Sequence, residues 1–293
     1  MDTMQLKAFA KINLGLDVLR RREDGYHEVR MIMQTIRMYD KIVLKKTMNP
    51  GIHVSVNLSY LPVNENNLVY KAAKLLTEEF AVREGIAIEL KKFIPVAAGM
   101  AGGSSDAAAV LFGVNRMFQL GLSQQELMDR GVKIGADVPY CILRGTALAE
   151  GIGERLTPLP PMPDCQVLIA KPGISVSTKY VYENLHANTL TEHPDVDGML
   201  KALENQDLRG ITSRMDEGNV LERVTVKAYP VIAQIKDFMR SQGALNAMMS
   251  GSGPTVFGIF DDPGAARRAC QRLKKRNLAK QIYLTSPYNR RPL

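Results

Sequence analysis

Alternating apolar and polar residues characterise the first 20 residues of the chain. Between Gln5 and Arg20 the apolar positions fall on one face of an extended segment: Ile12, Leu14, Leu16 and Val18. The intervening positions are small or polar: Lys11, Asn13, Gly15 and Asp17. A period of two predicts a long strand. It also predicts one buried face and one face turned to water or a ligand.

Further strands and helices are predicted along the whole chain. In the first half, the pattern predicts strands over 29–35, 41–46, 53–56 and 86–91 and helices over 67–80, 107–118 and 124–131. In the second half, it predicts strands over 167–170, 255–260 and 281–285 and helices over 177–185, 196–203, 231–241 and 264–275. The proline cluster at 159–163 separates the halves, because proline continues neither a helix nor a central strand. We therefore predict an α+β fold with two domains, 1–160 and 161–293.

Composition narrows the class of protein. The 293 residues are 45% apolar and 23% charged, typical of a globular chain and not of a disordered one. No apolar run reaches the roughly 20 residues of a membrane helix, and no secretory signal is visible. The widely spaced Cys141, Cys165 and Cys270 disfavour a disulfide framework or a structural zinc site. We expect a cytoplasmic protein without a metal site of its own. Its net charge of +8 favours acidic partners, such as nucleic acid, anionic membranes or phosphorylated metabolites.

The glycine-rich segment 95–109 carries the strongest chemical signal. Three glycines permit backbone conformations that a Cβ forbids, and Ser104 and Ser105 are good residues for beginning a helix. A glycine loop that leads into a helix N-terminus presents free N–H groups and binds phosphate. The segment matches neither a Walker A loop nor the dinucleotide fingerprint. The alternative interpretation is a tight turn between a strand and a helix.

Three shorter motifs each allow a functional and a structural interpretation. The loop 250–253 is either a second anion-binding nest or a turn before a strand. Tyr26 and His27 lie in a turn, where they either stack on and hydrogen-bond a nucleobase or face solvent. Asp137, between small and apolar residues, either accepts a proton from a substrate or closes a turn.

Taken together, these motifs resemble those of the GHMP kinases. The resemblance runs from about Lys7 to about Phe260 and rests on AKINLGLDV, DGYHE, GGSSDAA, GADVP and SGSGPTVF. It implies an N-terminal domain like that of ribosomal protein S5 and a ferredoxin-like C-terminal domain. It also implies transfer of the γ-phosphate of ATP to a hydroxyl of a cytidine diphosphate-linked polyol. That reaction is a step of isopentenyl diphosphate synthesis by the non-mevalonate pathway.

The resemblance also implies roles for individual residues. Lys11 and Asp137 would form the catalytic pair. The ATP phosphates would be bound by Pro95, Val96, Ala97, Ala98, Gly99, Met100, Ala101, Gly102, Gly103, Ser104 and Ser105. The cytidyl substrate would be bound by Asn13, Tyr26 and His27, with Thr178 and Tyr182 from the segment SVSTKYVY. Asn67, Leu68 and Lys92 would border the adenine. Mg²⁺ would arrive on the triphosphate, with Ser104 or Ser105 as one oxygen ligand.

Two other functions stay open at this point. One is another small-alcohol kinase of the same superfamily, acting on homoserine or mevalonate. Tyr26 and His27 disfavour it, because a substrate without a nucleobase does not require them. The other is a non-enzymatic nucleic-acid-binding protein, which the basic charge favours. The chain has no Trp and only 6% aromatic residues, so platforms for base stacking are few. We therefore expect small-molecule substrates, no nucleic acid or membrane partner, and a monomer or homodimer.

Overall fold

The computed structural model describes residues 2–289. The chain divides into two compact units, each built from separate segments. The first unit contains Met1–Ala10, Met38–Val96 and Ala101–Leu143, and the second contains Lys11–Arg37, Ala97–Met100 and Arg144–Leu293. Two long strands, β1 (Thr3–Arg21) and β2 (His27–Thr47), contribute residues to both units. Both units mix strands and helices, which confirms the predicted α+β class.

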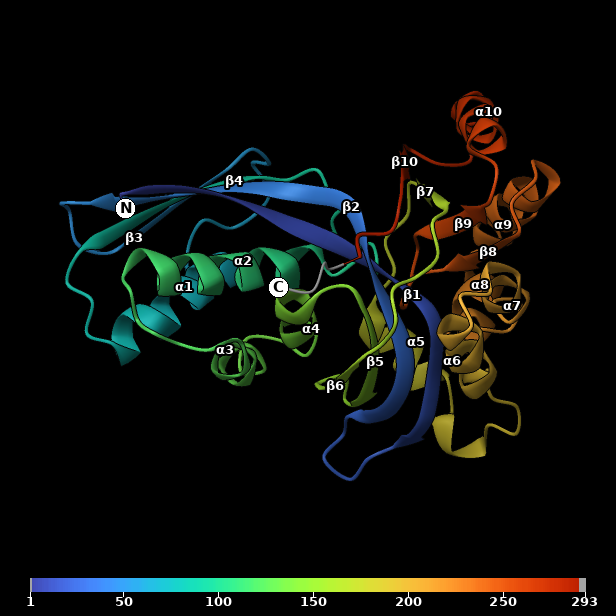
Figure 1. Cartoon of the computed structure of the whole chain (residues 1–293), viewed down its shortest axis with the longest axis horizontal. Coiled ribbons are helices and arrows are strands. Elements are labelled where there is room, and N and C mark those ends of the chain that lie inside the picture. Colours follow the sequence, from blue (N-terminus) through green and yellow to red (C-terminus); the bar gives the residue numbers. More distant parts are fainter. Residues whose placement is uncertain (1, 290–293) are drawn as a thin grey trace. The chain divides into compact units, whose positions relative to one another are not determined.

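The first unit is a sheet covered by helices. In this unit, β2 pairs antiparallel with β4 (Gly85–Lys91), with Lys41 opposite Lys91. The short strand β3 (Ile52–Val56) runs parallel to β4. The helices α1 (Leu68–Glu79) and α2 (Gly102–Met117) pack side by side beneath the sheet (Figure 1). They are followed by α3 (Gln124–Gly131) and α4 (Val138–Leu143).

The second unit contains a four-stranded antiparallel sheet with the order β10-β7-β9-β8. Its strands are β7 (Gln166–Lys171), β8 (Asn246–Met249), β9 (Val256–Phe260) and β10 (Gln281–Thr285). The helices α9 (Val231–Ser241) and α10 (Pro263–Lys274) pack against these strands (Figure 1). Chain succession β-α-β-β-α-β with this strand order is the ferredoxin-like arrangement, as expected.

The other elements of the second unit precede β7 in the sequence or lie between β7 and β8. The strand β5 (Thr146–Gly151) pairs with β2 and with β6 (Arg155–Pro158). Between β7 and β8 lie α5 (Thr178–Asn184), a 3-10 turn (Ala187–Thr189), α6 (Val196–Glu204), α7 (Leu208–Ser213) and α8 (Glu222–Ala228). The proline cluster 159–163 lies inside this unit, where Met162 is buried.

Three of the predicted segments differ in detail from the structure. The segments 29–35 and 41–46 belong to one continuous strand, β2, because residues between them keep pairing and burial. Helix α2 begins at Gly102 and not at Ala107, since the left-handed backbone of Ala101 (φ 54°) makes the turn into it. In β1, Lys11, Asn13 and Asp17 are buried along with their apolar neighbours. Of the two alternatives for this polar face, water is therefore excluded, and a ligand stays a prediction. Within residues 2–289, no helix combines the length and apolar character needed to cross a membrane.

Candidate active site

A buried lysine and asparagine lie side by side on β1 in the second unit. Lys11 is 4% exposed, and its Nζ donates to Asn13 Oδ1 at 2.7 Å. Asn13 Nδ2 in turn lies 3.2 Å from the sulfur of Met31 on β2. The backbone N–H of Lys11 donates to Met100 O at 3.2 Å. A buried cation costs free energy unless it is paired. Within residues 2–289, the hydrogen-bond partner of the Lys11 ammonium is a neutral amide, so this lysine is suited to bind an anionic ligand.

Two glycine loops meet in the same unit. Ser250 Oγ donates to Gly99 O at 2.9 Å. Gly99 has φ 69°, and a Cβ built on it would lie 2.0 Å from Ser250 O. A Cβ on Gly251 would lie 3.3 Å from Gly99 O and 3.6 Å from Asn13 Oδ1. Glycine at 99 is therefore required both by the positive φ and by the close approach of the second loop. The loop 250–253 thus lies against the segment 97–100 and near Asn13.

The glycine-rich segment crosses between the units along the chain. Pro95, Val96 and residues 101–105 belong to the first unit, and residues 97–100 to the second. In the described residues, no side chain caps the N-terminus of α2. Its first-turn N–H groups and the positive end of its dipole are therefore suited to an anion. Ser105 Oγ is buried and donates to Phe9 O at 2.7 Å, whereas Ser104 is partly exposed. Ser104 is the better placed of the two to bind a ligand.

A buried ion triad lies beneath this helix start in the first unit. Lys92 Nζ donates to Asp40 Oδ2 at 2.5 Å and to Asp106 Oδ2 at 2.6 Å. Asp40 Oδ1 also accepts the N–H groups of Phe93 and Ile94, at 2.5 and 2.8 Å. Lys92 precedes the glycine loop and Asp106 follows it. The triad therefore joins the two ends of that loop.

Charge and burial set the protonation of the triad. Burial raises the pKa of Asp106, and the Lys92 cation opposes this shift only in part. Burial lowers the pKa of Lys92, but Asp106 and Asp40 more than compensate, so its pKa lies above the ordinary value. Lys92 is therefore a firmly protonated group engaged by two carboxylates. The contact with adenine expected for it stays a prediction, and its ammonium is already occupied.

Asp137 lies in the first unit, just before α4. It is partly exposed, and its carbonyl accepts the N–H of Cys141 at 3.1 Å. A Cβ on Gly135 would lie 3.9 Å from Ser104 Oγ, so the segment 135–139 runs close to the start of α2. Gly135, two residues before Asp137, therefore lies near the candidate phosphate-binding helix, and the role of the Asp137 carboxylate there stays a prediction. Its pairing with Lys11, which belongs to the second unit, stays a prediction.

The residues expected to bind a nucleobase gather in the second unit. Tyr26 is 60% exposed in the turn between β1 and β2. The His27 ring contacts that of Tyr182 on α5, with centroids 4.8 Å apart and planes inclined by 45°. Burial, with a smaller contribution from the charge of Arg21, lowers the pKa of His27. A neutral imidazole offers one donor and one acceptor. Thr178 Oγ1 lies 2.8 Å from Ser252 Oγ, which connects α5 to the loop 250–253.

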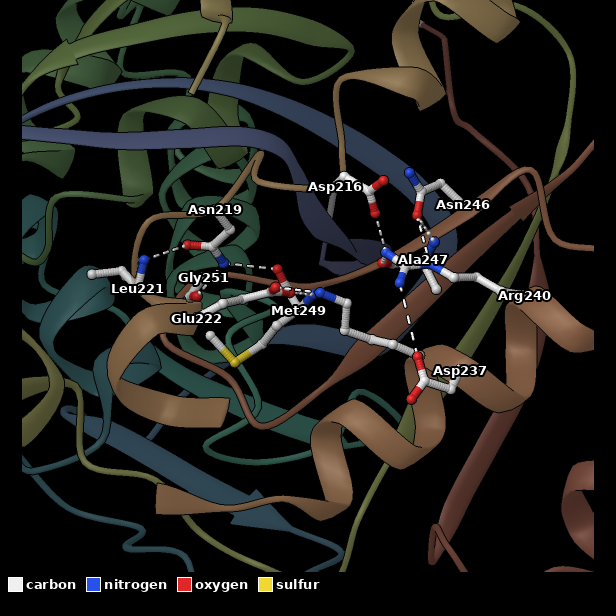
Figure 2. Close-up of polar contacts among 11 residues, drawn as sticks. Asp216, Asn219, Leu221, Glu222, Asp237, Arg240, Asn246, Ala247, Met249 and Gly251 are labelled. Atoms are coloured by element: carbon white, nitrogen blue, oxygen red, sulfur yellow. Dashed lines mark hydrogen bonds and ion pairs between the residues drawn. The ribbon is translucent and has the colours of Figure 1, made fainter. Parts of the chain in front are cut away.

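Sequence reasoning did not find the residues that hold the two glycine loops. Asp40 lies in a strand segment, next to Lys41, without any motif around it. Asn219 precedes α8 and is buried, and its side chain donates to the carbonyls of Gly251, in the loop 250–253, and of Met249, just before it (Figure 2). No spacing rule links either residue to a loop that lies far from it in the sequence. Their sequence surroundings, RMYDKI and DEGNVL, mix charged and apolar residues and give no signal of such a link.

Known proteins resemble this chain over almost its full length. The model of the GHMP kinases N terminal domain matches residues 67–145, and that of the GHMP kinases C terminal matches residues 199–279. A 4-diphosphocytidyl-2-C-methyl-D-erythritol kinase of Lachnoclostridium phytofermentans is 59% identical over 285 residues, which cover 97% of each chain. The solved structure of a 4-(cytidine 5'-diphospho)-2C-methyl-D-erythritol kinase superposes with a TM-score of 0.82 at 33% identity, covering 98% of this chain and all of that one.

A more distant structure shares the fold alone. The homoserine kinase of Cytophaga hutchinsonii superposes with a TM-score of 0.76 at 20% identity, covering 98% of this chain and 94% of that one. The sequence identity to the two 4-diphosphocytidyl-2-C-methyl-D-erythritol kinases, 59% and 33%, is higher than the 20% identity to this homoserine kinase, and it extends over both units. The chain belongs to the GHMP kinases and, among them, to the family of 4-diphosphocytidyl-2-C-methyl-D-erythritol kinases.

Proposed function

We propose that this protein transfers the γ-phosphate of ATP to the 2-hydroxyl of 4-diphosphocytidyl-2-C-methyl-D-erythritol. The observation that carries the proposal is 59% identity to a kinase of that name over 97% of both chains. The uncapped start of α2 and the contact between the two glycine loops support it independently, because both suit a polyphosphate.

ATP would be bound by the segment 95–105. The N–H groups at the start of α2 would face the phosphates, and the positive end of its dipole would stabilise their charge. Mg²⁺ would neutralise the charge that develops during transfer. Ser104, whose hydroxyl is partly exposed, suits the role of its protein ligand better than Ser105. Most of the ligands would be phosphate oxygens and water.

The cytidyl group would be bound in the second unit. The paired rings of His27 and Tyr182 offer an aromatic surface beside a neutral imidazole that can hydrogen-bond a base edge. Tyr26 is exposed enough to stack on the cytosine. Asn13 and Thr178 would hold the polyol and its phosphates. Asn13 also positions the Lys11 ammonium through their hydrogen bond.

Asp137 and Lys11 would carry the chemistry. Asp137 would accept the proton of the substrate's 2-hydroxyl group while the oxygen of that hydroxyl attacks the γ-phosphorus. The bond from that phosphorus to the β,γ-bridging oxygen would break, and ADP would leave with the electron pair. Lys11 would stabilise the negative charge on the transferred group. The division into domains 1–160 and 161–293, a cytoplasmic location and a monomer or homodimer complete the proposal.

One assay tests the function. ADP release would be coupled to NADH oxidation, with ATP, Mg²⁺ and either the cytidyl substrate, homoserine or mevalonate. We expect turnover with the cytidyl substrate alone. Turnover with homoserine or mevalonate instead would keep the superfamily and refute the proposed substrate. A folded protein that is inactive with all three, yet binds RNA in a salt-dependent manner, would favour the nucleic-acid function.

A further inference from the structure

Asn219 is a buried amide whose hydrogen bonds all go to the main chain. It is 3% exposed. Its Nδ2 donates to Met249 O and to Gly251 O, both at 2.8 Å, and its Oδ1 accepts the N–H of Leu221 at 3.0 Å (Figure 2). Both amide hydrogens and the amide oxygen are thereby used. One side chain thus holds the carbonyls on either side of Ser250.

Asn219 is itself firmly placed. On one side of it, Gly218 O accepts the N–H of Leu16 at 2.7 Å. On the other side, the N–H of Val220 donates to Leu16 O at 3.0 Å. These two bonds fix Asn219 to β1, the strand that also carries Lys11 and Asn13. The position of the loop 250–253 relative to that strand therefore depends on this amide.

Glu222 binds the backbone N–H of Met249, the residue just before the loop 250–253. The N–H of Met249 donates to Glu222 Oε1 at 2.6 Å (Figure 2). The second carboxylate oxygen of Glu222 is paired with Lys236 on α9, which is also buried. Met249 therefore has its N–H fixed by Glu222 and its carbonyl fixed by Asn219.

The direction of the loop's carbonyls follows from these bonds. Asn219 binds the carbonyls of Met249 and Gly251, and Ser250 O accepts the N–H of Gly253 at 3.0 Å. For the N–H groups of Gly251 and Ser252, the described part of the chain offers no hydrogen-bond partner. Successive free N–H groups form a concavity that binds anions. The carbonyls, which would repel an anion, are occupied elsewhere.

We propose that Asn219 is a positioning residue for phosphoryl transfer. It holds the loop 250–253 between Gly99 and Asn13 and leaves the N–H groups of Gly251 and Ser252 to the phosphoryl oxygens. A Cβ on Gly251 would lie 3.3 Å from Gly99 O and 3.6 Å from Asn13 Oδ1, so Gly251 lies close to both residues. The inference rests on the proposed function, because it assumes that Gly99 belongs to the ATP site and Asn13 to the acceptor site.

The test compares Asn219→Ala with Asn246→Ala. Asn246 is buried to a similar degree, at 5% exposure. Its Nδ2 donates to Thr212 O at 2.8 Å, and its Oδ1 accepts the N–H of Ala247 at 2.8 Å and Arg240 Nε at 2.9 Å. It therefore stabilises the start of β8 without contacting the loop (Figure 2). Each variant removes one buried amide, so Tm should fall in both.

Kinetics separate the two variants. A misplacement of about 1 Å in a catalytic site costs roughly 10²-fold, so Asn219→Ala should lower kcat/KM for ATP by about that factor. Asn246→Ala should keep kcat/KM within about threefold. Asn219→Ser keeps one donor in a small side chain and should give an intermediate value, which also provides a folded variant if the alanine chain does not fold.

Two results would overturn the inference. One is wild-type kcat and KM in a folded Asn219→Ala or Asn219→Ser variant. The other is an equal loss of kcat/KM in the Asn219 and Asn246 variants, which would show a purely structural role. If the wild-type chain has no turnover with the cytidyl substrate, it is the proposed function that fails, and the comparison between variants is then made by ATP binding.

Discussion

Replacing Lys92 with methionine removes the cation from the buried triad while nearly conserving side-chain volume. The side chains of Lys92, Asp40 and Asp106 are 5%, 0% and 2% exposed. Water therefore cannot take the place of the ammonium. Two carboxyl groups remain, and Asp106 Oδ1 already lacks a hydrogen-bond partner within residues 2–289.

The magnitude follows from this geometry. Removing one partner of a buried ion pair costs about 3–5 kcal/mol. Asp40 keeps the two backbone N–H groups of Phe93 and Ile94, and Asp106 can take up a proton, so we expect the lower end, about 3 kcal/mol. At about 2–4 °C per kcal/mol, Tm should fall by about 6–12 °C.

The pH dependence of the loss has a definite sign. In the wild type, burial already raises the pKa of Asp106, and Lys92 opposes this shift. Without Lys92 that opposition is lost, so the folded-state pKa of Asp106 moves further above its unfolded value. The contribution of Asp106 to stability is then present at low pH and lost as the pH rises through its raised pKa. The deficit of Lys92→Met relative to the wild type should therefore grow between acidic and neutral pH.

Urea unfolding followed by circular dichroism measures the loss. Lys91→Met is the matched control, because the adjacent Lys91 is 55% exposed and pairs with Glu89 at 3.0 Å on the surface. Such a pair contributes at most about 1 kcal/mol. The reasoning is refuted if Lys92→Met unfolds within about 1 kcal/mol of the wild type, or if its deficit shrinks as the pH rises.

Four further predictions concern the site. Asp137→Asn should lower kcat by about 10²–10⁴-fold, the usual contribution of a general base, with Tm unchanged in a thermal melt. Tyr26→Ala should raise KM for the cytidyl substrate and leave KM for ATP unchanged, as steady-state assays with each substrate varied would show. Because burial, followed by the charge of Arg21, lowers the pKa of His27, KM for the cytidyl substrate should be flat above the ordinary pKa of 6.5 and rise only below it. Gly99→Ala would place a Cβ 2.0 Å from a backbone carbonyl at φ 69°, so ATP binding measured by calorimetry should weaken more than tenfold.

Most of the fold follows from patterns in the sequence. The strands at 53–56 and 86–91 and the helices at 67–80 and 231–241 agree with the structure to within a few residues, because each has one apolar face. The short α4, α7 and α8 were not predicted. A helix of six or seven residues has too few turns to show a period. The predicted start of α2 was too late, because glycines such as Gly102 and Gly103 are typical of loops. In the structure, the left-handed backbone of Ala101 makes the turn, and the helix begins at Gly102.

The candidate site is predictable only where a local motif encodes it. Three parts of the site can be recognised from motifs of a few residues: the glycine loop, the turn with Tyr26 and His27, and the segment around Asp137. The contact between Tyr182 and His27, at 4.8 Å, depends on α5 meeting the β1–β2 turn. Asn219 reaches residues about 30 positions further along the chain. Such contacts depend on tertiary packing, which a single sequence does not display.

Both glycine loops are held by polar side chains that lie outside them, and the properties of glycine explain why such side chains are needed. Glycine supplies the backbone freedom that brings N–H groups to a phosphate, but it loses more conformational entropy on ordering than any other residue. It also provides no side chain to fix the loop. In the first unit, Lys92 and Asp106 join the ends of one loop, and in the second unit Asn219 and Glu222 bind the backbone of the other. Each set is buried, so its hydrogen bonds cannot be replaced by water without a large penalty. Residues that never contact a substrate should for this reason control turnover almost as strongly as those that do.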